Sequence, residues 1–153
     1  ELSYLWETTF FSRILRSDAQ PTLEALDKLG YRLGVISNTS SRTQVFRTLD
    51  QYGIAHYFEH VVLSSIEGIR KPARAIFDSA LNRMGVSAGS ATYVGDTLSR
   101  DVIGSKRAGF ALAIQIKSFL TDEIDNKLGS CNVKPDYFVK SLREIPDILK
   151  RIE

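Results

Sequence analysis

The chain has 153 residues, with 20 Lys and Arg against 18 Asp and Glu and a formal net charge of +2. One domain with a continuous core is expected, and the absence of any basic block gives no reason to expect nucleic acid or an anionic membrane as a partner. No apolar run approaches the roughly 20 residues of a membrane span, no signal segment begins the chain, and the single cysteine, Cys131, indicates a reducing, cytoplasmic location.

Residues 1–19 form the first predicted unit, a helical segment that differs from the rest of the chain. At helical spacing its apolar side chains spread over much of the circumference: Leu2, Leu5, Trp6, Phe10, Phe11, Ile14 and Leu15. Such a helix needs covering on several sides. We expect a cap remnant or an interface helix, covered by the sheet domain, by a second copy in a homodimer, or by a segment that this chain does not contain.

Residues 20–153 form the second predicted unit, in which helices alternate with strands. Helices are expected over 21–29, 45–52, 76–84 and 99–108, and strands over 33–36, 61–63, 91–94, 111–116 and 137–139. A short helix with a loop is expected within 117–135. Pro146 indicates the start of the last helix, although Ser141 and Glu144 have capping-box spacing. Apolar strands separated by helices predict a doubly wound, Rossmann-like α/β fold with a parallel sheet covered on both faces.

Polar side chains follow the predicted strands at the edge where open α/β sheets bind their ligands. Ser37 and Asn38 end the first strand, Lys71 follows the second, and Asp96 ends the third with Asp101 five residues on. A hydroxyl followed by the backbone amides of a helix start can hold phosphate oxygens, and a lysine adds a compact positive charge. Two aspartates with water can hold Mg²⁺. The pattern therefore predicts a site for phosphate and magnesium.

These motifs, taken in order, resemble the haloacid dehalogenase-like (HAD) hydrolases, a family of mostly magnesium-dependent phosphatases. The similarity runs from about residue 21 to the end. A hydrophobic strand ending in Ser or Thr matches 33–38, a lysine followed by proline and a helix matches 71–77, and Gly-Asp with a later Asp matches 95–101. The resemblance implies hydrolysis of a small phosphorylated metabolite with Mg²⁺ as cofactor.

The resemblance also implies a role for each residue. Ser37 is expected to hydrogen-bond the transferring phosphoryl group, and the main-chain amide of Asn38 to complete the phosphate cradle. Lys71 is expected to orient the nucleophile and offset charge, so that the catalytic roles fall on Lys71 and Ser37. Asp96 is expected to bind magnesium, with Asp101 supporting or joining its shell. Each residue also has a structural interpretation, as a helix cap for the serine and the aspartates and as a solvated loop residue for the lysine.

The family's first motif, an Asp-x-Asp whose first aspartate is the nucleophile, has no match. The acidic residues upstream of Ser37 are Glu1, Glu7, Asp18, Glu24 and Asp27, and none follows a buried apolar strand or has a second aspartate two residues on. A gap is therefore expected between the strands that end at Ser37 and Asp96. Three explanations stay open: a fragment of a longer hydrolase, a non-catalytic relative that binds phosphate or a partner, or a chain whose gap is filled by residues 1–19 or by another subunit's strand.

Overall fold

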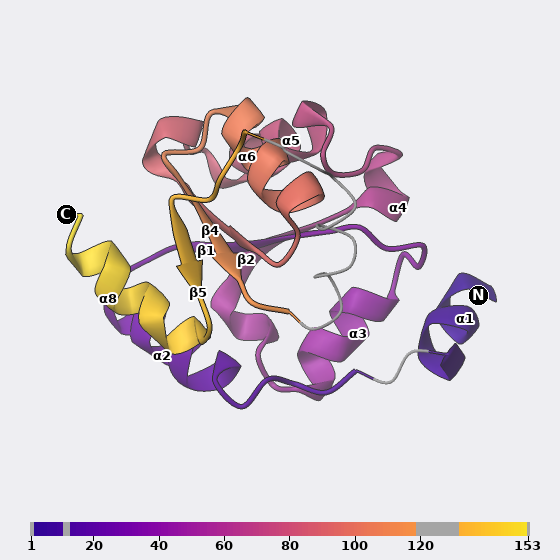
Figure 1. The fold of residues 1–153 in the computed structure, drawn as a ribbon. Coiled ribbons are helices and arrows are strands. Elements are labelled where there is room, and N and C mark those ends of the chain that lie inside the picture. The colour runs from indigo at the N-terminus through magenta and orange to yellow at the C-terminus, as the bar shows by residue number, and fades with distance from the viewer. Residues whose placement is uncertain (1, 11–12, 119–131, 153) are drawn as a thin grey trace.

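The computed structural model describes residues 2–10, 13–118 and 132–152 (Figure 1). The helices are α1 (Leu2–Phe10), α2 (Ala19–Lys28), α3 (Gln44–Gln51), α4 (Ser64–Glu67), α5 (Arg74–Met84), α6 (Ile103–Ala108) and α8 (Ile145–Lys150). The strands are β1 (Leu33–Ser37), β2 (Phe58–Leu63), β3 (Thr92–Gly95), β4 (Leu112–Ile116) and β5 (Tyr137–Val139). Short helical turns are η1 (Ala55–Tyr57), η2 (Ala88–Ser90), η3 (Leu98–Val102) and η4 (Leu142–Glu144). The predicted α/β alternation is confirmed, while most of the segment 117–135, with Cys131, lies outside the described residues.

All the strand pairs are parallel, but they form two separate sheets. One has the order β1-β2 and the other β3-β4-β5. Because parallel strands end at a common edge, the residues that follow β1, β2 and β3 gather there. In the part of the chain that the structure describes, no ladder joins β1 to β3. Among the described residues, the strands that end at Ser37 and Asp96 are therefore not paired with each other.

Two cavities, of about 310 and 400 Å³, lie beside β1 and β3. Both are lined by residues of β1 and of β3, among them Ile36 and Tyr93. The smaller cavity also touches Leu81 of α5, and the larger touches Leu26 of α2 and Ile145 of α8, so they lie on opposite faces of these strands. The two cavities therefore lie where β1 and β3 face each other without pairing.

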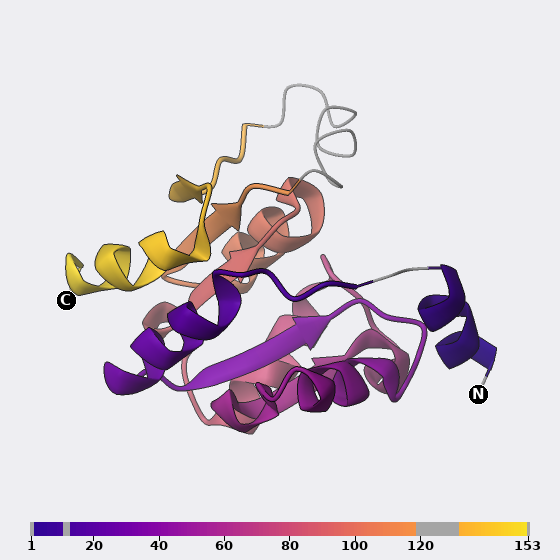
Figure 2. The same ribbon diagram turned by 90° about the horizontal axis from the view of Figure 1, so that it is seen from below.

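Helices cover both faces of the sheets, with α5 and α6 on one side and α2 and α8 on the other (Figures 1 and 2). Each side has its own apolar cluster. On the α2 and α8 side the cluster contains Leu26, Ile114, Ile116, Val139, Ile145 and Leu149, and on the α5 side it contains Val62, Ile76, Phe77, Ala80, Tyr93 and Ala108. This three-layer packing explains why the predicted strands are apolar throughout. None of the helices in the described part of the chain is long and apolar enough to span a bilayer.

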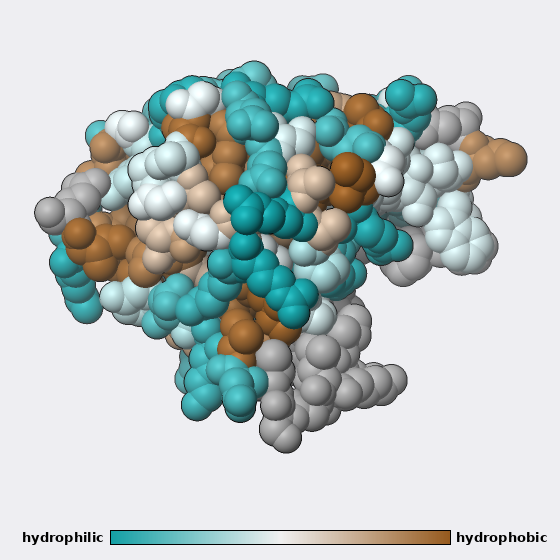
Figure 3. Space-filling view, turned by 90° about the horizontal axis from the view of Figure 1, so that it is seen from above, coloured by the Kyte–Doolittle hydropathy of each residue, from teal (hydrophilic) through white to brown (hydrophobic). Residues whose placement is uncertain are grey.

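The first segment differs from its prediction. The helix α1 ends at Phe10, and Ile14 and Leu15 lie in non-helical chain before α2 begins at Ala19. The helix projects beyond the body of the molecule and carries hydrophobic surface at its outer end (Figure 3). Its exposed apolar side chains are Leu2, Leu5 and Trp6. Among the side chains of α1 that the structure describes, only that of Glu7 is buried.

Both sequence signals for the start of the last helix, the capping box and Pro146, are present in the structure. Ser141 and Glu144 form a capping box around η4, because Ser141 Oγ accepts a hydrogen bond from the Arg143 amide and Glu144 Oε1 accepts one from the Ser141 amide at 2.9 Å. Pro146 then lies in the first turn of α8, which begins at Ile145. Expecting the helix to start only at Pro146 was therefore incomplete, because the capping box adds a turn before it.

Asp18 connects the chain before α2 to this final turn. It pairs with Arg16 at 3.0 Å and accepts hydrogen bonds from the Ser141 hydroxyl and the Leu142 amide, each at 2.9 Å. The Arg16 side chain holds the pKa of the Asp18 carboxyl well below its usual value, and the Leu142 and Ser141 donors act in the same direction, against the effect of burial. The ionised form is therefore stabilised by folding.

Asp18→Asn is expected to lower the free energy of unfolding by about 1–2 kcal/mol at pH 7. Because the folded pKa is depressed, this stabilisation is fully present above the unfolded value of about 3.9 and is lost as the pH falls below it. Urea denaturation at pH 7 and pH 3 measures the difference, with Asp27→Asn on an exposed part of α2 as the control. An equal loss at both pH values would contradict this account.

Candidate active site

A pocket of about 200 Å³ lies at the carboxyl ends of β1 and β3. It is lined by Ile36, Ser37, Asn38, Lys71, Asp96, Thr97, Arg100 and Asp101. All five residues singled out in the sequence therefore line one pocket, although they come from three separate segments of the chain. The topology explains this meeting, since parallel strands deliver their carboxyl ends to the same edge.

Lys71 is held by three acceptors inside the pocket. Its ammonium donates to the main-chain carbonyl of Ile36 at 3.0 Å, to the Tyr93 hydroxyl at 3.0 Å and to Asp101 Oδ1 at 2.7 Å. The side chains of Lys71 and Asp101 are only 12% and 3% exposed, so the ion pair is shielded from water. Burial first, and then the Asp101 charge, raise the pKa of Tyr93 well above its usual value, so its hydroxyl stays protonated.

Both oxygens of Asp101 are occupied by protein donors. Oδ1 accepts from Lys71 and from the Tyr93 hydroxyl at 3.1 Å, and Oδ2 accepts from the Thr97 amide at 3.0 Å and the Thr97 hydroxyl at 2.8 Å. Burial by itself raises the pKa of Asp101, but Lys71 and the two Thr97 donors outweigh it and hold the pKa below the usual value. Gly95 is required for this contact, because a Cβ there would overlap the Asp101 side chain. Asp101 is thus a buried anion that positions Lys71 and the turn after β3.

Ser37, the last residue of β1, and Asn38, which follows it, differ in the hydrogen bonds of their side chains. The Asn38 side chain accepts from the Lys71 amide at 2.9 Å and donates to the Lys71 carbonyl at 3.0 Å, which ties the two loops together. Any contact of Asn38 with phosphate would therefore come from its main-chain amide. The Ser37 hydroxyl, half-buried in the pocket, has no hydrogen-bond partner among the described residues, so it is available to a ligand.

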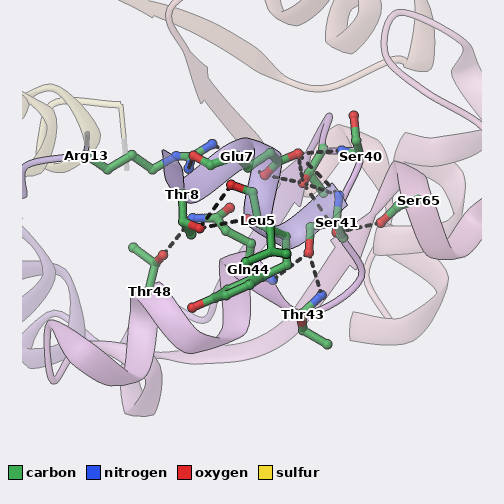
Figure 4. Close-up of polar contacts among 12 residues, drawn as sticks. Leu5, Glu7, Thr8, Arg13, Ser40, Ser41, Thr43, Gln44, Thr48 and Ser65 are labelled. Carbon is green, nitrogen blue, oxygen red and sulfur yellow. Dashed lines mark hydrogen bonds and ion pairs between the residues drawn. The ribbon is translucent and has the colours of Figure 1, made fainter. Parts of the chain in front are cut away.

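The helix predicted over 45–52 is present, but Ser37 does not cap it. The helix α3 begins at Gln44, and a six-residue loop, 38–43, precedes it. The amides of this loop bind Glu7 of α1, whose Oε1 accepts from the amides of Ser40 at 2.7 Å and Ser41 at 3.2 Å (Figure 4). The loop residues after Asn38 are thus held by a carboxylate of the chain itself.

Glu7 is the centre of this cluster of polar contacts (Figure 4). The Thr39 hydroxyl donates to its Oε1 at 2.8 Å, and Arg13 pairs with its Oε2 at 3.5 Å. Glu7 is only 6% exposed. The Tyr52 hydroxyl of the chain after α3 donates to the Arg13 carbonyl at 2.6 Å and fastens the segment after α1 as well. The first segment is therefore attached to the site loop through polar contacts, while its apolar side chains Leu2, Leu5, Trp6 and Ile14 are exposed.

The residues of the pocket fit only part of a magnesium site. Magnesium is usually bound by one or two carboxylates, with water and substrate phosphate completing an octahedron. Asp96 lines the pocket and fits one ligand position. Both oxygens of Asp101 already accept hydrogen bonds from protein donors. Asp101 is therefore better suited to supporting the metal shell than to binding the metal itself. Within the described residues no group of three or more acidic, histidine or cysteine side chains could hold a metal by itself.

Sequence reasoning missed four residues of this site: Glu7, Tyr93, Thr97 and Arg100. Thr97 and Arg100 lie inside the Gly-Asp to Asp101 motif, so their position in that turn was a usable signal. Tyr93 lies in a strand that the sequence predicts as apolar, and its hydroxyl accepts a hydrogen bond from Lys71. An aromatic residue in a strand does not by itself indicate such a polar contact. Glu7 had no local signal, because its partners in the site loop, Thr39, Ser40 and Ser41, lie more than 30 residues away.

Comparisons with known proteins match the chain along most of its length. A model of the haloacid dehalogenase-like hydrolase family matches residues 4–109. The chain is 32% identical to a glyceraldehyde 3-phosphate phosphatase of Methanopyrus kandleri over 88% of this chain and 56% of that protein. It is 31% identical to the N-acylneuraminate-9-phosphatase of Homo sapiens over 100% of this chain and 59% of that protein.

A solved structure gives the same result for the fold. The crystal structure of a HAD phosphatase from Thermococcus onnurineus has a TM-score of 0.73 and 33% sequence identity, covering 88% of this chain and 58% of that one. The chain spans about half the length of the curated relatives it matches.

Proposed function

The chain belongs to the haloacid dehalogenase-like hydrolases, and from this membership we propose that it provides the phosphate-binding part of a phosphatase. The substrate is a small phosphorylated metabolite, since the relatives are named for glyceraldehyde 3-phosphate and N-acylneuraminate 9-phosphate. The main support for this proposal is the pocket at the carboxyl ends of β1 and β3, which Ser37, Lys71 and Asp96 line together. The cofactor is Mg²⁺, for which Asp96 supplies one ligand.

The residues that line the pocket have distinct roles in this proposal. The Ser37 hydroxyl and the Asn38 amide donate to the non-bridging oxygens of the phosphoryl group, whose negative charge they stabilise. Lys71 adds a positive charge that Asp101 holds in place at 2.7 Å. Bound magnesium neutralises charge on the phosphoryl oxygens.

The attacking carboxylate is the part that the described residues do not supply. In the part of the chain that the structure describes, the only carboxylates that line the pocket are Asp96 and Asp101, and both oxygens of Asp101 already accept hydrogen bonds. We propose that the nucleophile is an aspartate at the end of a strand that enters the gap between β1 and β3. A strand parallel to its neighbours there ends at the same edge as Ser37 and Asp96, within reach of the pocket.

Hydrolysis of p-nitrophenyl phosphate with Mg²⁺ tests this proposal. The chain alone, or with a synthetic apolar strand peptide that ends in Asn-x-Asn, is expected to give no turnover above the blank. The same peptide ending in Asp-x-Asp is expected to give turnover, because it fills the gap and adds the nucleophile. Equal turnover by the chain alone would contradict the requirement for a second strand, and no turnover in any arm would contradict the phosphatase proposal.

A binding module without catalysis is the second candidate, favoured by the lack of an available nucleophile among the described pocket residues. It predicts that phosphate and Mg²⁺ raise the melting temperature of the chain without turnover in any arm. An unchanged melting temperature with both ligands would count against it.

A further inference from the structure

The hydrogen bonds of Lys71 limit what it can do for a substrate. An ammonium has three N–H donors, and three protein acceptors lie within 3.0 Å of this one: the Ile36 carbonyl, the Tyr93 hydroxyl and Asp101 Oδ1. A phosphate oxygen can therefore gain a hydrogen bond from Lys71 only if a buried partner loses one. Lys71 acts on a ligand chiefly through its charge, which Asp101 largely offsets.

Arg100 is the other cation that lines the same pocket. It lies in the π-helical turn η3, between the pocket residues Thr97 and Asp101, and its side chain is half-buried. A guanidinium has five N–H donors. One of them, on Nη2, donates to the Thr97 hydroxyl at 3.2 Å, and the others have no acceptor in the described part of the chain. No carboxylate of the described residues forms an ion pair with Arg100.

The Thr97 bond also fixes where the guanidinium lies. The Thr97 hydroxyl is itself anchored, because it donates to Asp101 Oδ2 at 2.8 Å and Thr97 is only 1% exposed. Arg100 is thus held at the pocket through a buried residue rather than extended into water. A guanidinium with spare donors in fixed geometry suits the tetrahedral oxygens of a phosphoryl group, to which it can bind with two hydrogen bonds.

We propose that Arg100 binds the phosphoryl group of the substrate directly and is the main hydrogen-bonding cation of this site. This inference rests on the proposed function, since it assigns a residue to the same phosphate pocket. It divides the work between two cations: Lys71 organises the buried anion Asp101, and Arg100 contacts the ligand. The Ser37 hydroxyl, which is also without a described partner, faces the same pocket and completes the set of available donors.

Isothermal titration of the chain with inorganic phosphate, in the presence of Mg²⁺, tests the assignment. Arg100→Gln is expected to weaken phosphate binding by at least about tenfold, because a charge-assisted pair of hydrogen bonds is lost. Arg100→Lys keeps the charge but not the paired donors, and is expected to give an intermediate affinity. The matched control is Arg107→Gln, which removes the same charge from an exposed position on α6 and is expected to stay within about twofold of the parent chain.

The outcomes separate this inference from the proposed function. Unchanged affinity in Arg100→Gln, or equal weakening in Arg100→Gln and Arg107→Gln, would overturn the role of Arg100 and leave the phosphate site standing. A folded parent chain that binds no phosphate would overturn the proposed function and this inference with it. Thermal unfolding of each variant, followed by circular dichroism, shows that the variants compared are folded.

Discussion

Lys71→Met is expected to lower the free energy of unfolding by about 3–5 kcal/mol at pH 7, because it leaves Asp101 as a buried charge without its partner. Asp101 is 2% exposed, and the remaining donors, Tyr93 and Thr97, carry no charge. Chemical denaturation of the two proteins measures the loss. The loss is expected to shrink as the pH falls, because protonation of Asp101 removes the unpaired charge, and without Lys71 nothing but the Thr97 donors opposes the rise in the Asp101 pKa that burial causes.

A surface pair provides the matched control for this experiment. Lys106 Nζ and Asp136 Oδ1 are also 2.7 Å apart, but each side chain is 33% exposed. Lys106→Met is expected to cost no more than about 1 kcal/mol, because water screens the pair and solvates the remaining carboxylate. If the two substitutions cost the same, burial is not what makes the Lys71 pair important.

Glu7→Gln is expected to cost about 2–3 kcal/mol and to release the loop that follows Asn38. The carboxylate accepts from the amides of Ser40 and Ser41 and from the Thr39 hydroxyl, and bonds to a charged acceptor are stronger than those to an amide oxygen. Glutamine also places an NH₂ group among these donors. Amide hydrogen exchange at Ser40 is expected to speed up, since its N–H lies 2.7 Å from Glu7 Oε1.

The control for Glu7 is Glu59→Gln. Glu59 pairs with Arg32 at 2.6 Å on the surface, with 41% of its side chain exposed, so Glu59→Gln is expected to destabilise the fold much less than Glu7→Gln. Unchanged exchange at Ser40 in Glu7→Gln would show that the loop holds its conformation without the carboxylate. In that case α1 is not coupled to the site through Glu7.

Much of the fold could be predicted from local patterns. The apolar run at 33–36 became β1, and the spacing of Ile76, Phe77 and Ala80 became the buried face of α5. The glycines at 30 and 85 follow helices with φ of +80° and +63°, values that residues with a Cβ rarely adopt. These predictions succeeded because each depends on neighbours within about one turn of helix or a few residues of strand.

The predictions that failed concern segments whose structure depends on distant partners. The first helix was expected to include Ile14 and Leu15, because both are apolar, but they lie in non-helical chain and Ile14 is 88% exposed. The helix predicted over 45–52 is present as α3, but the loop 38–43 separates it from Ser37 and binds Glu7. The contacts of this loop with Glu7 span more than 30 residues, so no local pattern indicates them.

The sequence by itself determined the order of the elements, the parallel α/β class and the gathering of Ser37, Asn38, Lys71, Asp96 and Asp101 around one pocket, because parallel strands end at a common edge. Only the tertiary structure decided how these groups are used. The Asp101 carboxylate pairs with Lys71 rather than with a ligand, and Arg100 has N–H donors that no described residue accepts. Glu7 of α1 is buried against a loop more than 30 residues further along the chain. Those outcomes depend on which buried charges find partners when segments distant in sequence pack together, and no local pattern contains that information.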